Sequence, residues 1–161
     1  MQNDIDSLYD GNDLEIMSLA EESRLPGKNR VEEIRNYALK AGIKRIGIAN
    51  CIGLQKEADK LKSFLSADFE VFDVNCKCGQ IPKNALLKTN KTGACCNPAG
   101  QAKTLASHET ELNIVLGLCL GHDILFNQKS RAPVTTLIVK DLALKHKTHQ
   151  WFESTDEKDT K

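Results

Sequence analysis

The chain has 161 residues, of which 40% are hydrophobic and 27% charged, a composition typical of one soluble globular domain. Lys+Arg and Asp+Glu both number 22, and only 5% of the residues are aromatic, so neither a net field nor a stacking surface indicates nucleic-acid binding. No apolar run approaches the roughly 20 residues of a membrane span, and no signal peptide is recognisable. We therefore expect a cytoplasmic protein whose six cysteines are metal ligands or redox thiols.

The first part of the chain predicts two helices. Residues 1–12 are mostly polar and predict a loose N-terminus, after which Asp13 is expected to cap a helix over residues 14–22. A connector containing Pro26 and Gly27 follows. From residue 30 to 41 apolar residues recur at helical spacing, and Gly42 is expected to end this second helix.

A strand, a helix and a strand are predicted next, over residues 44–50, 54–65 and 69–74. Elements of these lengths form a βαβ unit, in which the two strands are parallel and the crossover is right-handed. Cys51 and Cys76 directly follow the two strands. Both cysteines are therefore expected at the same edge of a sheet.

Residues 80–94 are the one long irregular piece, with several lysines, and loops of this length are binding loops, lids or simply mobile. Asn97 and Pro98 then begin a predicted helix that ends at Ser107, because asparagine is a favoured cap and proline a favoured first helical residue.

Two further strands are predicted, over residues 113–118 and 134–139, with a helical turn at residues 124–127 between them. The predicted fold is a single α/β domain over residues 13–144, with a mainly parallel, Rossmann-like sheet of about four strands flanked by helices. The charged residues 145–161 predict a disordered tail.

Four cysteines lie where these elements begin or end. Cys51, Cys76 and Cys119 each follow a predicted buried strand, and ligands of open α/β sheets bind outside the carboxyl ends of the strands. Cys96 precedes a predicted helix, whose positive dipole end favours the thiolate. A buried cysteine is also a common small hydrophobic residue. Four thiols directed towards one crevice nevertheless favour a metal site.

Three further residues are secondary candidates. Cys78 shares a side with Cys76 only if extended geometry continues through Lys77, and Cys95 neighbours Cys96, so one of that pair should point away. Both could be extra ligands or accessory redox thiols. His122 could bind the same metal, donate to a ligand sulfur or act as a catalytic acid or base, and its ordinary alternative is a loop histidine bonded to Asp123.

Lysines of the irregular segment present a similar choice, because they could attract an anionic substrate or simply form a solvated surface. The lysines concerned are Lys77, Lys83, Lys88 and Lys91.

Four motifs in order carry a family resemblance: Cys51-Ile-Gly-Leu, Cys76-Lys-Cys-Gly, Cys96-Asn-Pro-Ala-Gly-Gln-Ala and Gly-Leu-Cys119-Leu-Gly-His122-Asp123. Over residues 29–145 the chain resembles an uncharacterised prokaryotic family of domain-of-unknown-function proteins described as predicted metal-binding proteins. The resemblance implies that Cys51, Cys76, Cys96 and Cys119, with His122, are the matching site positions. Cys78 and Cys95 are additions, and the cysteine-rich N-terminal segment that such proteins often carry is missing. The resemblance supplies no reaction.

The donor set narrows the choice of metal. Four thiolates suit zinc, copper(I) or an iron–sulfur cluster, and widely spaced cysteines on separate loops favour a cluster over zinc, which generally takes closely spaced pairs. We expect an iron–sulfur protein in redox, sulfur-transfer or sensing work. The alternatives are a zinc-binding structural or interaction module, and a metal-free thiol enzyme in which Cys96 reacts first. The sequence identifies neither a partner nor a substrate, and it leaves open whether the protein is an enzyme.

Overall fold

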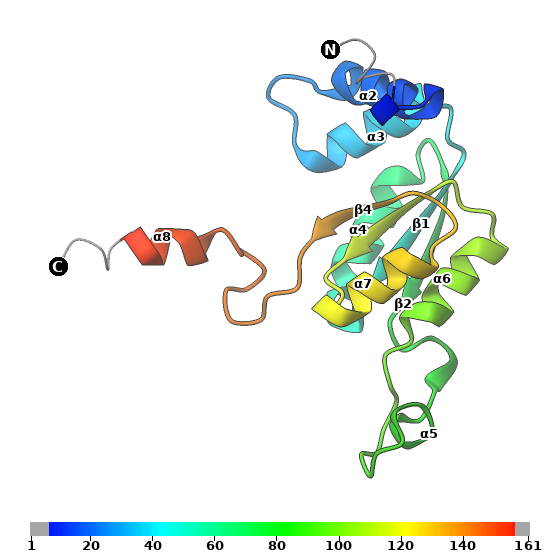
Figure 1. The fold of residues 1–161 in the computed structure, drawn as a ribbon, viewed down its shortest axis with the longest axis vertical. Helices are drawn as coiled ribbons and strands as arrows, with labels where there is room; N and C mark the ends of the chain where they lie inside the picture. Colours follow the sequence, from blue (N-terminus) through cyan, green and yellow to red (C-terminus); the bar gives the residue numbers. More distant parts are fainter. Residues whose placement is uncertain (1–6, 157–161) are drawn as a thin grey trace. The chain divides into compact units, whose positions relative to one another are not determined.

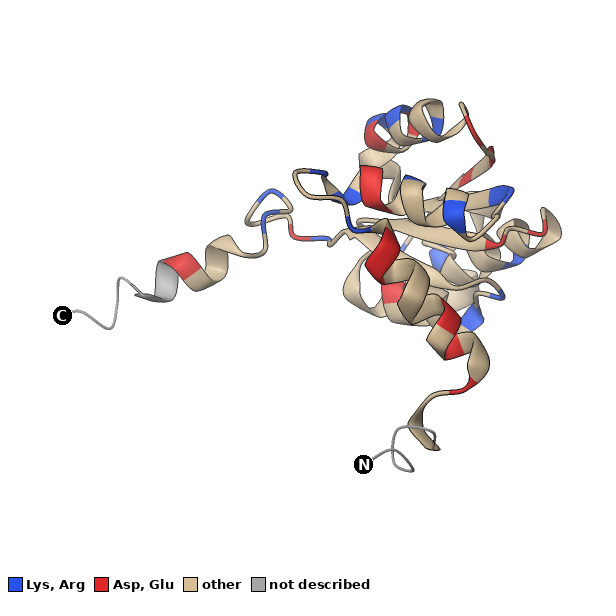
Figure 2. Ribbon diagram, turned by 90° about the horizontal axis from the view of Figure 1, so that it is seen from above, with Lys and Arg blue, Asp and Glu red and all other residues tan. Residues whose placement is uncertain are grey.

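The computed structural model describes residues 7–156, so the first six residues of the predicted loose N-terminus and the last five of the predicted tail lie outside it. The chain divides into two compact units, one up to Lys44 and one from Arg45 onward. None of the helices within residues 7–156 is long and apolar enough to cross a membrane. Basic and acidic residues are interspersed over the ribbon (Figure 2).

The first unit contains α2 (Gly11–Ser23) and α3 (Arg30–Lys40). The N-cap of α2 is Asp10, and the predicted cap at Asp13 is wrong. Asp13 is the third helical residue, where its backbone N–H donates to the Asp10 carboxylate over 2.9 Å and its own carboxylate accepts from the Asp10 N–H over 3.1 Å. Because these two bonds satisfy two donors at the helix start, the helix begins one turn earlier than predicted.

The second unit is built on one parallel sheet (Figure 1). Its strands are β1 (Arg45–Asn50), β2 (Glu70–Asn75), β3 (Leu112–Leu116) and β4 (Val134–Ile138), in the spatial order β2-β1-β3-β4. All three neighbouring pairs are parallel. The predicted α/β class with a four-stranded parallel sheet flanked by helices is confirmed, and every strand ends at the same edge of the sheet.

Helices cover both faces of the sheet (Figure 1). Residues of β1 alternate, so Ile48 is buried on the side of α4 (Gln55–Leu65), which follows the short 3-10 turn η1 (Ile52–Leu54). Ala49 points to the opposite side, where α6 (Pro98–Ser107) and α7 (Leu120–Lys129) pack. The core on that side is formed by Ala49, Cys76, Ala102, Leu105, Val115, Leu118 and Phe126.

The helix α7 corrects the prediction of a single helical turn at residues 124–127. The apolar run before it was predicted as strand up to Leu118, but β3 ends at Leu116 because Gly117 has φ +61°, which no strand residue adopts. Cys119 then becomes the N-cap of α7. Since short apolar runs fit a strand or a buried helix equally, periodicity misplaced this boundary.

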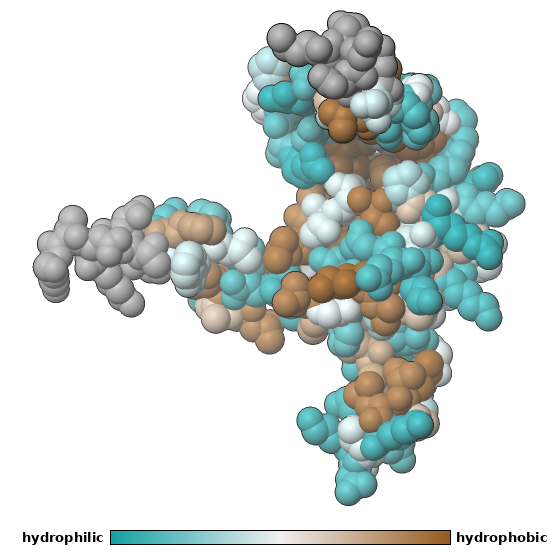
Figure 3. All heavy atoms as spheres, in the orientation of Figure 1, coloured by the Kyte–Doolittle hydropathy of each residue, from teal (hydrophilic) through white to brown (hydrophobic). Residues whose placement is uncertain are grey.

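An arm separates β2 from α6, and it is more ordered than the predicted irregular loop. It contains the 3-10 turn η2 (Cys78–Gln80) and the helix α5 (Lys83–Leu87). Its base is closed by an antiparallel bridge between Pro82 and Ala94, with backbone bonds that include the Cys95 N–H to Ile81 carbonyl bond of 2.7 Å. Leu86 and Leu87 on α5 are about half exposed and contribute an apolar patch (Figure 3).

The last described helix is α8 (Gln150–Asp156), inside the segment predicted as a disordered tail. A run of turns over residues 142–149 joins the end of β4 to this helix. The charged composition of residues 145–161 therefore did not prevent a helix over the part that the structure describes.

Gly117 provides a test of this fold. We expect Gly117→Ala to lower the free energy of unfolding by about 1–2 kcal/mol, because alanine is strained at positive φ and its Cβ would overlap the Leu54 side chain. Urea unfolding measures this. The matched control is Gly121→Ala, since Gly121 lies in α7 with no atom within 4 Å of the added Cβ, and alanine favours a helix. Equal losses in both variants would contradict the explanation.

Candidate functional site

The carboxyl edge of the sheet gathers the predicted cysteines. Asn50 at the end of β1 pairs with Asn75 at the end of β2, so Cys51 and Cys76 are the next residues on neighbouring strands. The start of α6 is attached to the same edge, since the Asn97 N–H donates to the Cys76 carbonyl over 2.8 Å. This bond places Cys96 beside Cys76. Parallel pairing therefore brings Cys51 and Cys76 together, and the hydrogen bond at the start of α6 adds Cys96.

Cys51, Cys76 and Cys96 form a row of sulfur atoms, which we call the thiol row. The Sγ atoms of Cys76 and Cys96 are 3.8 Å apart, and Cys51 and Cys76 are close enough for each thiol to shift the pKa of the other. Cys76 is the central member and is only 3% exposed. Its Sγ also accepts the Ile52 backbone N–H over 3.4 Å.

A lysine contacts each end of the thiol row. Lys140 Nζ lies 2.9 Å from Cys51 Sγ, and Lys77 Nζ lies 3.4 Å from Cys96 Sγ. Lys77 also donates to the Ala94 carbonyl over 2.8 Å, which holds its ammonium at the base of the arm. Lys77 was predicted as part of a solvated or substrate-attracting surface, whereas its ammonium contacts a site sulfur.

Sequence reasoning missed Lys140. The available signal was its position just after β4, because a polar residue after any strand of a parallel sheet reaches the edge where the cysteines lie. Only the strand order, with β4 next to β3, brings it within reach of Cys51.

The environment separates the pKa values of the thiols. Burial by itself would raise the pKa of Cys51, but hydrogen bonds from Lys140 and the Gly53 backbone N–H, and the Lys140 charge, lower it below its ordinary value. In return the Cys51 contact raises the pKa of Lys140. Burial is the main reason that the pKa of Cys76 rises to about 11, and the neighbouring Cys96 and Cys51 raise it further. The pKa of Cys51 is therefore lowered and that of its neighbour Cys76 raised, so the environment favours ionisation of Cys51 over Cys76.

Cys119 and His122 lie at the start of α7. Cys119 is exposed, and it lies near enough to Lys140, which contacts Cys51, to contribute to the raised pKa of that ammonium. His122 is half-buried, and its backbone N–H donates to the Cys119 carbonyl over 2.8 Å. Asp123 bonds to Asn127 instead, and none of the hydrogen bonds within residues 7–156 joins its carboxylate to the His122 ring. The bond to Asp123 that the ordinary alternative for His122 included is therefore not among the described hydrogen bonds.

The two additional cysteines lie next to the thiol row and outside it. Cys78 Sγ is 3.6 Å from the Asn97 carbonyl, and burial raises the pKa of its thiol. Cys95 is buried, with its backbone N–H bonded to Ile81. Neither sulfur is among those that contact the thiol row.

Gln101 supports the edge from α6, and sequence reasoning assigned it no role. Its Nε2 donates to the carbonyls of Asn50, over 3.2 Å, and Val74, over 2.7 Å, which precede the two strand-end cysteines. Gln101 Oε1 and Asn50 Oδ1 are buried and have no hydrogen-bond partner among the described residues. A buried oxygen without a hydrogen-bond partner costs about 1–3 kcal/mol of folding free energy. Both of these oxygens lie at the carboxyl edge of the sheet.

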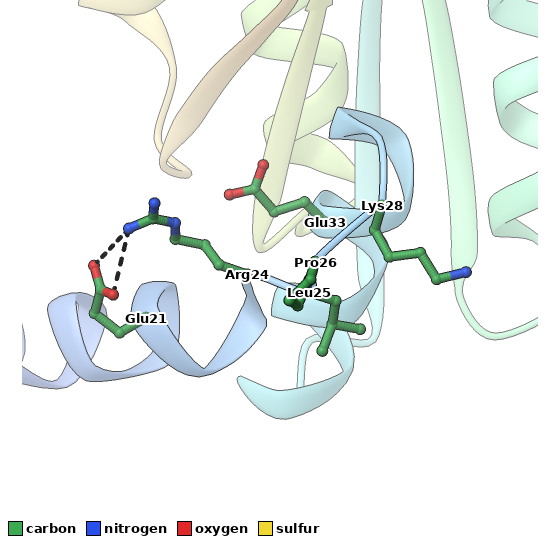
Figure 4. Close-up of a pocket in the computed structure, with 6 residues that line it drawn as sticks. All are labelled: Glu21, Arg24, Leu25, Pro26, Lys28 and Glu33. Atoms are coloured by element: carbon green, nitrogen blue, oxygen red, sulfur yellow. Dashed lines mark hydrogen bonds and ion pairs between the residues drawn. The ribbon is translucent and has the colours of Figure 1, made fainter.

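Within the described residues, the thiol row is neither a preformed metal site nor part of the pocket in the first unit. No three Cys, His, Asp or Glu side chains of residues 7–156 are already arranged to hold a metal ion. A pocket of about 500 Å³ lies elsewhere, in the first unit, with the Arg24–Glu21 ion pair of 3.2 Å at one side (Figure 4). Its lining has no thiol and mixed charge, and consists of Glu21, Arg24, Leu25, Pro26, Lys28 and Glu33.

Lys140 provides a test of the thiol row. We expect Lys140→Met to raise the pKa of Cys51, because the methionine side chain keeps the apolar stem and removes the ammonium that stabilises the thiolate. The measurement is the pH dependence of Cys51 alkylation in metal-free protein, read by peptide mapping. Lys77→Met is the matched control, since Lys77 contacts Cys96 and should leave Cys51 unchanged. An unchanged Cys51 pKa in Lys140→Met would refute the assignment.

Comparison with known proteins identifies relatives that match most of the chain. A family model described as protein of unknown function (DUF1847) matches residues 2–137. An uncharacterised protein of Methanocaldococcus jannaschii is 47% identical over 138 residues, which cover 83% of this chain and 72% of that protein. No solved structure matches the chain significantly. With the family model spanning most of its length, the chain belongs to the DUF1847 family of proteins of unknown function.

Proposed function

We propose that the carboxyl edge of the sheet binds a metal centre through thiolates, with Cys51, Cys76, Cys96 and Cys119 as ligands and an iron–sulfur cluster as the favoured group. The observation that carries the proposal is the thiol row, in which cysteines from three segments meet and the sulfurs of Cys76 and Cys96 are 3.8 Å apart. Such convergence is what a thiolate centre requires of a protein.

The spacing of the row suits thiolate ligation. Two sulfurs bound tetrahedrally to one metal at about 2.3 Å are about 3.8 Å apart, and Cys76 and Cys96 have this separation. The full set requires local rearrangement, since no metal-holding group of three is preformed within residues 7–156. Cys119 has the freedom to supply the fourth thiolate, because it is exposed. His122 is one turn away along α7 and can bond to a ligand sulfur.

The flanking lysines support a centre of negative charge. Several thiolates around one metal carry a net negative charge, and the ammonium groups of Lys140 and Lys77 each contact one sulfur of the row. Charges and hydrogen bonds at ligand sulfurs also set the reduction potential of an iron–sulfur cluster. The two lysines can therefore both stabilise the ligand set and tune it.

The donor arrangement favours a cluster over zinc. Structural zinc sites generally draw on closely spaced cysteine pairs, whereas these four thiols come from separate segments around an apolar core. A bound cluster supplies one-electron chemistry, which fits redox, sulfur-transfer or sensing work in a reducing compartment such as the cytoplasm. A zinc centre, tying the strand ends together, is the second candidate.

The first test is the content of anaerobically purified protein. We expect brown protein with broad visible absorption that contains iron and sulfide. Cys51→Ser, Cys76→Ser and Cys96→Ser should each lose most of the iron, whereas Cys78→Ser and Cys95→Ser should keep it, because those two sulfurs lie outside the thiol row. Colourless protein with stoichiometric zinc would replace the cluster by zinc, and metal-free protein would end the proposal.

The second test is the pH dependence of metal binding. Because the pKa of Cys76 is about 11, this thiol is protonated near neutral pH and must lose its proton to become a ligand. Affinity should therefore rise as pH rises, by about tenfold per pH unit for each displaced proton. Titration of metal-free protein with Co²⁺, followed through the thiolate-to-cobalt absorption at several pH values, measures the slope. A flat dependence would show that Cys76 is not a ligand.

A further inference from the structure

We propose that Cys76 and Cys96 also form a reversible dithiol–disulfide couple, through which the metal-free protein exchanges electrons with disulfide substrates. This activity does not depend on the metal centre, although the two states exclude each other because they use the same sulfurs. The sulfurs of these two cysteines are close together, and Cys96 is more accessible to solvent than Cys76.

The geometry selects this pair among the six cysteines. The two Sγ atoms are 3.8 Å apart, and a disulfide bond of about 2.0 Å needs a small approach of the side chains. The two segments are also held together by a backbone hydrogen bond, because the Asn97 N–H donates to the Cys76 carbonyl over 2.8 Å. A disulfide between the adjacent residues Cys95 and Cys96 would be strained.

Accessibility assigns the order of reaction. Cys96 is half-buried and can meet a substrate, whereas Cys76 is 3% exposed and can meet only its neighbours. Lys77 Nζ lies 3.4 Å from Cys96 Sγ and can donate a hydrogen bond to that sulfur. Cys96 is thus the attacking thiol and Cys76 the resolving thiol.

Both steps are thiol–disulfide exchanges. The Cys96 thiolate attacks one sulfur of a substrate R–S–S–R, which forms a mixed disulfide at Cys96 and releases R–S⁻, which takes up a proton. Cys76 Sγ then attacks Cys96 Sγ, and the second R–S⁻ leaves with the proton given up by Cys76. The substrate is reduced to two R–SH, and the two cysteines are oxidised by two electrons to the Cys76–Cys96 disulfide.

Cys51 is the competing attacking thiol within the row. Its sulfur accepts a hydrogen bond from Lys140 over 2.9 Å, and it is also a neighbour of Cys76. A reaction that began there would give a Cys51–Cys76 disulfide instead. Peptide mapping distinguishes these two products, because one joins the ends of β1 and β2 and the other joins the end of β2 to the segment before α6.

The experiment uses the full chain, reduced and freed of metal by chelation, with 2-hydroxyethyl disulfide as the substrate. We expect one intramolecular disulfide, mapped to Cys76 and Cys96, and its reversal by excess dithiol. Cys76→Ser should stop at a stable mixed disulfide on Cys96, because the resolving thiol is absent. Cys78→Ser and Cys95→Ser are the matched controls and should form the Cys76–Cys96 disulfide as the unsubstituted protein does.

A disulfide that maps to any other pair would overturn the inference, as would a Cys76→Ser adduct on Cys51. The mapping in the unsubstituted protein needs no variant to fold, so it stands alone. Metal content of protein that was never chelated is measured separately, and therefore a failure of the metal proposal is seen without reference to the disulfide. If chelated protein forms no disulfide with the substrate, the disulfide inference is overturned, and the result for metal binding is unaffected.

Discussion

Parallel pairing of the four strands is the constraint on which the rest of this structure depends. In a parallel sheet all strands run in one direction, so whatever follows each strand arrives at the same edge. Here β1 and β2 deliver Cys51 and Cys76, β3 leads to Cys119, and β4 leads to Lys140. A mixed sheet would have sent some of these residues to the opposite edge. The candidate site is therefore a consequence of strand direction.

The carboxyl edge of the sheet combines features that would each, taken alone, lower the stability of the fold. It brings three thiols together, two of them with sulfurs 3.8 Å apart, and it buries two amide oxygens, those of Asn50 and Gln101, without partners among residues 7–156. When sulfurs of the thiol row are ionised, the lysine at each end of the row offsets part of the free-energy cost of gathering them. Unsatisfied groups that gather at one place, beside shifted thiol pKa values, are typical of sites retained for function. The rest of the sheet, by contrast, is packed with apolar residues such as Ile48 and Val115.

Much of the fold could be predicted from the periodicity and spacing of apolar residues in the sequence. The four strands, the helices after Cys51 and Cys96, and the parallel direction all follow from apolar runs of strand length alternating with helical patterns. The boundary after β3 could not, because the run around Leu116 and Leu118 suits strand and helix alike until Gly117 adopts positive φ. The ordered arm could not either, since its closing bridge joins Pro82 to Ala94 across a segment with no periodicity.

The sequence by itself determined that thiols follow parallel strands, because residue type and chain position alone dictate which residue comes after an apolar run. It did not determine which thiol has a lowered pKa and which a raised one. That depends on Lys140, which lies 89 positions from Cys51 in the chain and 2.9 Å from it in space, and on the burial that raises the pKa of Cys76 to about 11. Coulomb interactions and desolvation act through distance and solvent exposure, and both quantities exist only once the strands have taken their order in the sheet.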